Sequence, residues 1–202
     1  MNCKTNIILT GVGGQGVITA ANILGKAAVR GKINVYVSEV HGIAQRGGAV
    51  NCTVRIGDLS GPLIATGTAD VILSTEPVEA LRNITYASKK TKVITDINPV
   101  IPFTVAIGGE EYPNLDDVFK EIRSCAELYK IDASKIAKKS GAIITKNIVM
   151  LGALAATDVL PFKSEILLET ILDNVPAKYK DINKKAFEGG MEVIKKILGF
   201  SL

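Results

Sequence analysis

A glycine-rich segment near the N-terminus constrains the fold more than any other part of the sequence. Its residues, Gly11-Val12-Gly13-Gly14-Gln15-Gly16, lie between a short apolar run at 6–10 and a segment at 17–30 with helical apolar spacing. Glycines at such a junction permit a tight turn and let a phosphate approach the backbone where a helix begins. We therefore predict a buried strand, a turn and a helix ended by Gly31. The candidate ligand-binding residues of this loop are Gly11, Gly13, Gly14, Gln15 and Gly16.

The rest of the chain alternates predicted strands with predicted helices before a helical C-terminal third. The predicted strands cover 33–40, 49–56, 71–75 and 92–95, and the predicted helices cover 77–87, 115–126, 133–140, 147–157, 164–174 and a last helix after Pro176. The helix at 147–157 is apolar all round, so it is either buried or part of an interface with a partner. We expect one domain over residues 1–202, a three-layer α/β/α sandwich around a mostly parallel, Rossmann-like sheet.

Composition excludes several classes of protein. The 202 residues are 47% hydrophobic and 22% charged, as in globular domains, which excludes disordered and fibrous chains. The net charge is +4, but the lysines follow helix faces without aromatic partners, so we expect no nucleic-acid binding. No apolar run is long enough to span a bilayer, and we expect no membrane association.

The cysteines exclude a resident iron–sulfur cluster. Cys3, Cys52 and Cys125 share no C-x-x-C spacing, so the chain cannot supply four thiolates to a cluster or a Cys-rich zinc site. We expect no cofactor or metal bound by this chain alone. A sparse, odd set of cysteines also fits a reducing compartment, and we expect a cytoplasmic protein.

The segment from His41 to Gly48 is the most informative stretch. It contains the single histidine of the chain, the long polar side chains of Gln45 and Arg46, and a flexible Gly47-Gly48 pair. It follows the predicted second strand, at the edge of the sheet where open α/β sheets bind ligands. We expect it to lie beside the glycine loop and to bind an anionic group or close a partner's active site. The alternative is a structural histidine and a surface ion pair.

A dinucleotide-binding dehydrogenase is a rival interpretation of the glycine loop. Such a site needs an acidic residue about 20 residues after the loop to hold the ribose. Glu39 lies 23 residues after Gly16 and is the candidate. The His41–Gly48 segment that follows has no role in a nicotinamide site, which disfavours this alternative.

Taken together, these segments resemble the gamma-domain family of 2-oxoacid:ferredoxin oxidoreductases. Within it the chain resembles the beta subunits of indolepyruvate:ferredoxin oxidoreductases and, more distantly, the gamma subunits of the pyruvate enzymes. The segments that carry the resemblance are Gly11–Val17, Ser38–Gly42 with Gln45–Gly48, Val54–Gly57, Ala69–Leu73, Glu76–Leu81 and Asn147–Ala153. The Gln45-Arg46-Gly47-Gly48 loop is the most specific of them and favours the indolepyruvate branch.

The resemblance implies a subunit of an enzyme that decarboxylates 2-oxo acids oxidatively to acyl-coenzyme A. It implies that a larger alpha subunit holds thiamine diphosphate, Mg²⁺ and 4Fe–4S clusters, that electrons pass to ferredoxin, and that coenzyme A is a co-substrate. This chain would be inactive alone and would complete or cap the thiamine site through His41, Gln45 and Arg46. The glycine loop, Glu39, Gly47 and Gly48 remain candidate ligand or interface residues. A purely structural subunit is the second alternative, and the resemblance leaves open the 2-oxo acid, the stoichiometry and any contact with the cofactors.

Overall fold

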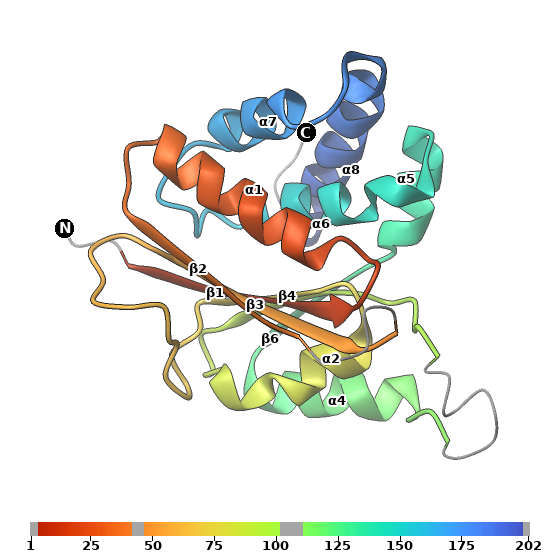
Figure 1. Ribbon diagram of the computed structural model, residues 1–202. Helices are drawn as coiled ribbons and strands as arrows, with labels where there is room; N and C mark the ends of the chain where they lie inside the picture. The colour runs from red at the N-terminus through yellow and green to blue at the C-terminus, as the bar shows by residue number, and fades with distance from the viewer. Residues whose placement is uncertain (1–3, 42–46, 102–110, 200–202) are drawn as a thin grey trace.

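The computed structural model describes residues 4–41, 47–101 and 111–199 and shows a six-stranded sheet between two layers of helices (Figure 1). The strands are β1 (Thr5–Val12), β2 (Val35–His41), β3 (Ala49–Ile56), β4 (Val71–Ser74), β5 (Lys92–Asp96) and β6 (Glu127–Ile131). The helices are α1 (Val17–Arg30), α2 (Pro77–Arg82), α4 (Leu115–Cys125), α5 (Ala133–Ser140), α6 (Lys146–Ala155), α7 (Ser164–Asp173) and α8 (Lys180–Ile197). Short 3₁₀ turns, η1 (Ile84–Tyr86), η2 (Ile143–Thr145) and η3 (Ala177–Tyr179), precede or join them. The predicted α/β/α sandwich is confirmed.

The sheet has the strand order β2-β3-β1-β4-β5-β6. β1, β4, β5 and β6 pair in parallel, whereas β3 pairs antiparallel with both β1 and β2. β2 therefore runs in the same direction as β1, and the mostly parallel sheet is confirmed with one antiparallel strand inserted. The short connection after β2 explains the insertion, because a few residues can join antiparallel neighbours but cannot make a parallel crossover.

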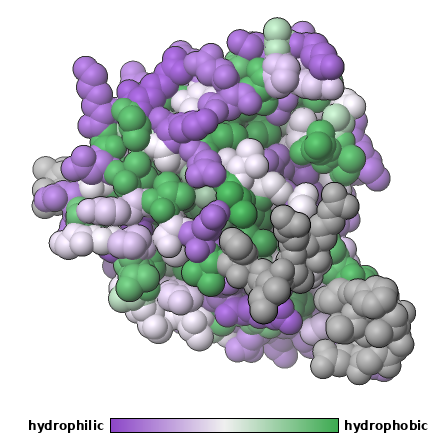
Figure 2. Space-filling model, in the orientation of Figure 1, coloured by the Kyte–Doolittle hydropathy of each residue, from purple (hydrophilic) through white to green (hydrophobic). Residues whose placement is uncertain are grey.

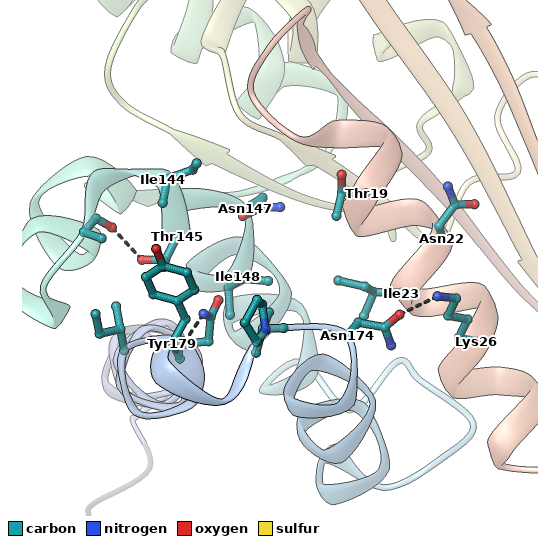
Figure 3. Close-up of a pocket in the computed structure, with 15 residues that line it drawn as sticks. Thr19, Asn22, Ile23, Lys26, Ile144, Thr145, Asn147, Ile148, Asn174 and Tyr179 are labelled. Carbon is teal, nitrogen blue, oxygen red and sulfur yellow. Dashed lines mark hydrogen bonds between the residues drawn. The ribbon is translucent and has the colours of Figure 1, made fainter.

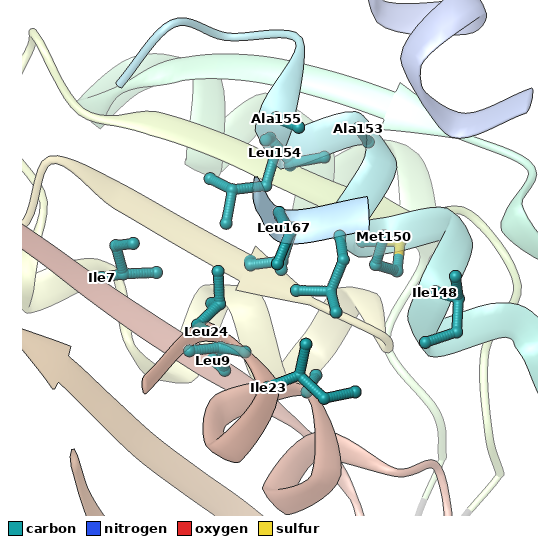
Figure 4. Close-up of a cluster of buried hydrophobic side chains, with 14 of the residues drawn as sticks. Ile7, Leu9, Ile23, Leu24, Ile148, Met150, Ala153, Leu154, Ala155 and Leu167 are labelled. Carbon is teal, nitrogen blue, oxygen red and sulfur yellow. The ribbon is translucent and has the colours of Figure 1, made fainter. Parts of the chain in front are cut away.

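Hydrophobic cores fill both sides of the sheet. The larger core lies under α1, α6, α7 and α8, and its side chains meet those of β1 in Figure 4. The smaller core lies under α2 and α4 on the opposite face. On β3, the predicted alternation is confirmed: Val50, Cys52, Val54 and Ile56 are buried, and the residues between them are half-buried.

The helix α6 is almost wholly buried within its own chain, apart from its first residues, which line two pockets. Each residue from Asn147 to Ala155 is buried, and α8 packs across it at backbone contact. A Cβ atom at Gly190 would lie 2.0 Å from the carbonyl oxygen of Val149, and one at Gly152 would lie 2.0 Å from that of Phe187. The close packing requires glycine at both positions. Of the two predicted roles for this all-apolar helix, burial is confirmed, and an interface is wrong for it.

Several element boundaries differ from the sequence prediction. The strand β6 was not predicted, because residues 127–131 follow α4 without a glycine or proline to mark the change. The helix predicted over 77–87 ends at Arg82 and continues as η1. Within the described ranges, no helix has the length and apolar character needed to cross a bilayer.

Candidate functional site

The glycine loop lies between β1 and α1, at the edge of the sheet where the parallel strands end. β1 ends at Val12, α1 begins at Val17, and Gly16 between them has a left-handed φ of 77°. The side chain of Gln15 turns back into the protein, where it accepts hydrogen bonds from the Val12 amide at 2.7 Å and the Thr75 hydroxyl at 2.6 Å. This predicted ligand residue therefore also fastens the loop to the end of β4.

The contact between the loop and β4 depends on a glycine. A Cβ atom at Gly11 would lie 2.0 Å from the Thr75 hydroxyl oxygen and 2.8 Å from the side-chain oxygen of Gln15. Any larger residue would therefore push the end of β1 away from Thr75. The structure explains Gly11 by close packing.

The second predicted loop begins and ends beside the first. The Gly13 amide donates a hydrogen bond to the Gly48 carbonyl at 2.8 Å, and Gly11 and His41 both pair with Val50 in the sheet register. The expectation that the two loops are neighbours is therefore confirmed for the described residues. Gly47 has a left-handed φ of 78°, which favours glycine. Gln45, Arg46 and the side chain of His41 lie outside the described residues.

A pocket of about 440 Å³ opens at the start of α1. Its lining residues come from the glycine loop, α1, η2 and α6: Gly14, Gln15, Gly16, Thr19, Ile143, Ile144, Lys146 and Asn147. The amides of the first helical turn have no partners inside the helix and carry partial positive charge. These amides can bind an anion, and Lys146, Ile143 and Ile144 line the pocket beside them.

A buried carboxylate holds Lys146 in this pocket. The Lys146 ammonium forms an ion pair with Asp96, whose side chain is 0% exposed, against 13% for the lysine. Asp96 also accepts hydrogen bonds from the Ala133 amide at 3.1 Å and the Asn98 side chain at 2.9 Å. Because a buried charge needs such partners, the network fixes the position of the lysine. No sequence pattern predicts this pair, because its members lie 50 residues apart.

A second, larger pocket adjoins the first (Figure 3). It has a volume of about 720 Å³ and shares Thr19, Ile144 and Asn147 with the smaller pocket. Ile23 on α1 and Ile148 on α6 give it an apolar wall, and Tyr179 lies on the α8 side. The Lys26 ammonium donates a hydrogen bond to the Asn174 side chain at its rim. The joined pockets could take a molecule with an anionic end and an apolar or aromatic part.

Glu39, the candidate ribose ligand, lies on β2 opposite Cys52 of β3. Because β3 separates β2 from β1, Glu39 stands two strand spacings from β1, roughly 10 Å. In a dinucleotide-binding fold the corresponding acid lies on the strand next to β1. Burial, and then the Glu39 carboxylate, raise the pKa of the Cys52 thiol to about 11, so the thiol stays protonated at neutral pH.

Two buried carboxyl groups lie at the start of α2, on the other face of the sheet. Glu76 caps the helix by accepting from the Glu79 amide at 2.8 Å, and it also accepts from the Tyr112 hydroxyl. Glu79 bonds Arg82 at 2.7 Å, but its second carboxyl oxygen is buried and has no hydrogen-bond partner among the described residues. Burial raises the pKa of Glu79, and Arg82 partly opposes the shift. The sequence predicted that a helix starts at this segment, but it did not predict that Glu76 and Glu79 would both be buried.

Comparison with known proteins agrees with this architecture. The model of the family described as pyruvate ferredoxin/flavodoxin oxidoreductase matches residues 6–193. Indolepyruvate oxidoreductase subunit IorB of Thermococcus kodakarensis is 46% identical over 197 residues, which cover 96% of this chain and 98% of the relative.

Solved structures share the fold at lower identity. The gamma subunit of keto/oxoacid ferredoxin oxidoreductase from Geobacter sulfurreducens PCA superposes with a TM-score of 0.69 and 24% identity, covering 95% of this chain and 99% of that one. The 2-oxoglutarate:ferredoxin oxidoreductase from Magnetococcus marinus, with 2-oxoglutarate, coenzyme A and succinyl-CoA bound, has a TM-score of 0.74 and 22% identity over 97% of this chain and 32% of its own. From the family match and the full-length identity, this chain belongs to the pyruvate ferredoxin/flavodoxin oxidoreductase family.

Proposed function

We propose that this chain is the cluster-free subunit of a 2-oxoacid:ferredoxin oxidoreductase whose substrate is indolepyruvate or a related arylpyruvate. The observation that carries the proposal is the 46% identity to an indolepyruvate oxidoreductase subunit over nearly the whole of both chains. The complete enzyme would decarboxylate the 2-oxo acid oxidatively, transfer the acyl group to coenzyme A and pass the electrons to ferredoxin. This chain would be inactive alone.

In this proposal a larger alpha subunit holds thiamine diphosphate, Mg²⁺ and the 4Fe–4S clusters. Among the described residues, no three or more histidine, cysteine or carboxylate side chains are grouped so that they could hold a metal ion. Cys52 is a free, buried thiol, and Cys125 is also free. Free thiols suit a reducing compartment, which supports a cytoplasmic location.

In the complete enzyme, this chain would bind part of coenzyme A and help to enclose the thiamine site of the alpha subunit. We infer that the pocket at the glycine loop holds an anionic part of coenzyme A, with its apolar part in the adjoining larger pocket. The lining residues support this: the start of α1 and Lys146 line the smaller pocket, and apolar side chains form much of the wall of the larger one. The related enzyme from Magnetococcus marinus binds coenzyme A.

The segment from His41 to Gly48 would close the thiamine site of the alpha subunit. Its described end is held against the glycine loop by the bond between Gly13 and Gly48. His41, Gln45 and Arg46 would then be the residues of this chain nearest the 2-oxo acid.

A variant of the Lys146 pair tests the coenzyme A pocket. Lys146→Met is combined with Asp96→Asn so that no buried charge is left without a partner. A charge-assisted hydrogen bond is worth about 1.5–3 kcal/mol, so the KM for coenzyme A of the assembled enzyme should rise about tenfold or more. The control is Lys184→Met, which removes an exposed lysine of α8 and should leave this KM unchanged. A wild-type KM for coenzyme A in the double variant would exclude this pocket as the anion site.

Co-expression with the alpha subunit tests the assembly. The two chains should purify together under anaerobic conditions, and neither should oxidise indolepyruvate alone. An isolated chain stabilised by a nicotinamide cofactor would favour the dehydrogenase alternative. A complex with normal turnover after the Gln45–Gly48 segment is replaced would favour a purely structural subunit.

A further inference from the structure

The two edges of the sheet differ in character. At one edge, β6 exposes the charged side chains of Glu127 and Lys130, which discourage pairing with another strand. At the other edge, β2 exposes Tyr36, Val37 and Val40, whose exposed fractions are 40%, 39% and 71%. Hydrophobic side chains reach the surface in several places on the face shown in Figure 2. β2 also exposes Glu39, but three of its seven residues are apolar and exposed, which suits pairing with another strand.

The hydrogen bonds of β2 to β3 show which backbone groups remain for a further strand. The Gly57 amide donates to the Asn34 carbonyl at 2.8 Å, so residue 34 directs its backbone groups toward β3. Because directions alternate along a strand, residues 36, 38 and 40 do the same. Val35, Val37, Glu39 and His41 therefore direct their amides and carbonyls outward, away from the sheet.

We propose that β2 pairs antiparallel with β2 of a second copy of this chain, about a two-fold axis at Ser38. In this register Val37 pairs with Glu39 of the second copy, and Val35 pairs with its His41. The backbone amides and carbonyls of these residues point away from their own sheets, so the two residues of each pair can hydrogen-bond to each other. Tyr36 faces Val40 at a position without backbone bonds, where opposing side chains approach most closely. Because of the two-fold symmetry, this contact between Tyr36 and Val40 forms twice.

Other two-fold registers fit the strand less well. An axis at Glu39 would place its carboxylate opposite that of the second copy, which is unfavourable. An axis at Val37 would leave Val40, the most exposed side chain of the strand, opposite Asn34. The axis at Ser38 places no like charges opposite each other and gives each exposed apolar side chain of β2 a cross-strand neighbour. This self-complementarity favours a second copy over an unrelated strand.

A disulfide test measures the register directly. Across an antiparallel position without backbone bonds the Cα atoms lie about 4.5 Å apart, within the range of a disulfide. In a chain with Cys3→Ser and Cys125→Ser, Ser38→Cys should therefore give a covalent dimer of this subunit under mild oxidation. The same result is expected in the complex with the alpha subunit. The matched control is Val40→Cys, which would face Tyr36 and should remain mainly monomeric on denaturing gels.

The pairing is overturned if Ser38→Cys gives no covalent dimer in either preparation, or if it cross-links to the alpha subunit instead. Equal cross-linking of Val40→Cys and Ser38→Cys would also contradict the register. A second measurement avoids cysteine chemistry: Val40→Lys should raise the dissociation constant of the dimer at least tenfold by sedimentation. Val29→Lys, at a 65% exposed valine on α1, should leave it unchanged. A wild-type dimer that tolerates Val40→Lys would exclude β2 as the interface.

Discussion

The side-chain oxygen of Gln15 lies 2.6 Å from the hydroxyl of Thr75, and this bond joins the loop after β1 to the end of β4. The connections leave these two strands toward opposite faces of the sheet, since α1 covers one face and α2 the other (Figure 1). Ligands of open α/β sheets bind where the connections diverge in this way. Gln15 therefore sets the shape of the edge at which both candidate loops lie.

Removing the Gln15 side chain should destabilise the fold. Gln15→Ala leaves the Val12 amide without this acceptor and leaves the Thr75 hydroxyl with only the longer, 3.4 Å bond to the Thr10 carbonyl. We expect the free energy of unfolding in urea to fall by about 1–3 kcal/mol. A double-mutant cycle with Thr75→Val should show coupling between the two sites. Additive losses would mean that the bond contributes nothing to stability.

The crossing of α6 and α8 should not tolerate a methyl group at Gly190. A Cβ there would lie 2.0 Å from the Val149 carbonyl oxygen, which is backbone and cannot move aside. We expect Gly190→Ala to cost about 1–3 kcal/mol in thermal or urea unfolding, despite the better helix propensity of alanine. The control is Gly189→Ala, which meets a side-chain methyl of Ile136 at 2.7 Å and should lose less. Equal stability of the two variants would contradict the close packing.

The sequence predicted elements with local signals better than relationships between distant segments. The helix at 17–30 and the strand at 49–56 were predicted with their observed bounds, because Gly31 ends the helix and alternating burial marks the strand. β6 carries no such signal: it is a short edge strand with one fully buried side chain, Ile131. What covers α6 could not be decided locally, because the answer depends on α8.

The candidate site likewise combines features that local sequence signals predict with features that depend on distant segments. The glycine loop and its proximity to Gly48 follow from strand ends, which the sequence marks. The pair of Lys146 and Asp96 depends on long-range topology, and the pattern of neither segment shows it. The antiparallel β3 was also not predicted, because alternation shows that a strand is half-buried but not its direction.

Glu79 should make stability depend on pH. Its folded-state pKa is raised, first by burial, above its ordinary value of 4.5. Its contribution to stability is therefore greatest below pH 4.5 and is lost as the pH rises through the folded-state value. Glu79→Gln cannot ionise, so its stability relative to wild type should increase between pH 5 and pH 8. Urea unfolding at both pH values measures this difference in stability. If the stabilities of the two proteins change with pH in parallel, the raised pKa of a buried Glu79 carboxylate is contradicted.

Arg46→Ala should lower turnover of the assembled enzyme while the subunit remains folded. Arg46 lies outside the described residues, and the expectation rests on its place between Gln45 and the Gly47-Gly48 pair. A guanidinium suits a carboxylate or phosphate, and loss of one charge-assisted bond, about 1.5–3 kcal/mol, lowers the rate about tenfold or more if it acts in the transition state. Unchanged steady-state kinetics with a slightly lower melting temperature would show that Arg46 is only structural.

The central claim is that this chain completes an enzyme whose cofactors belong to another subunit. The most direct measurement is ferredoxin reduction with indolepyruvate and coenzyme A, using the purified alpha subunit with and without this chain. We predict negligible rates for either chain alone and restored, coenzyme A-dependent turnover when the two are combined. An alpha subunit that is fully active without this chain, or a combination that stays inactive although the complex has formed, would contradict the claim.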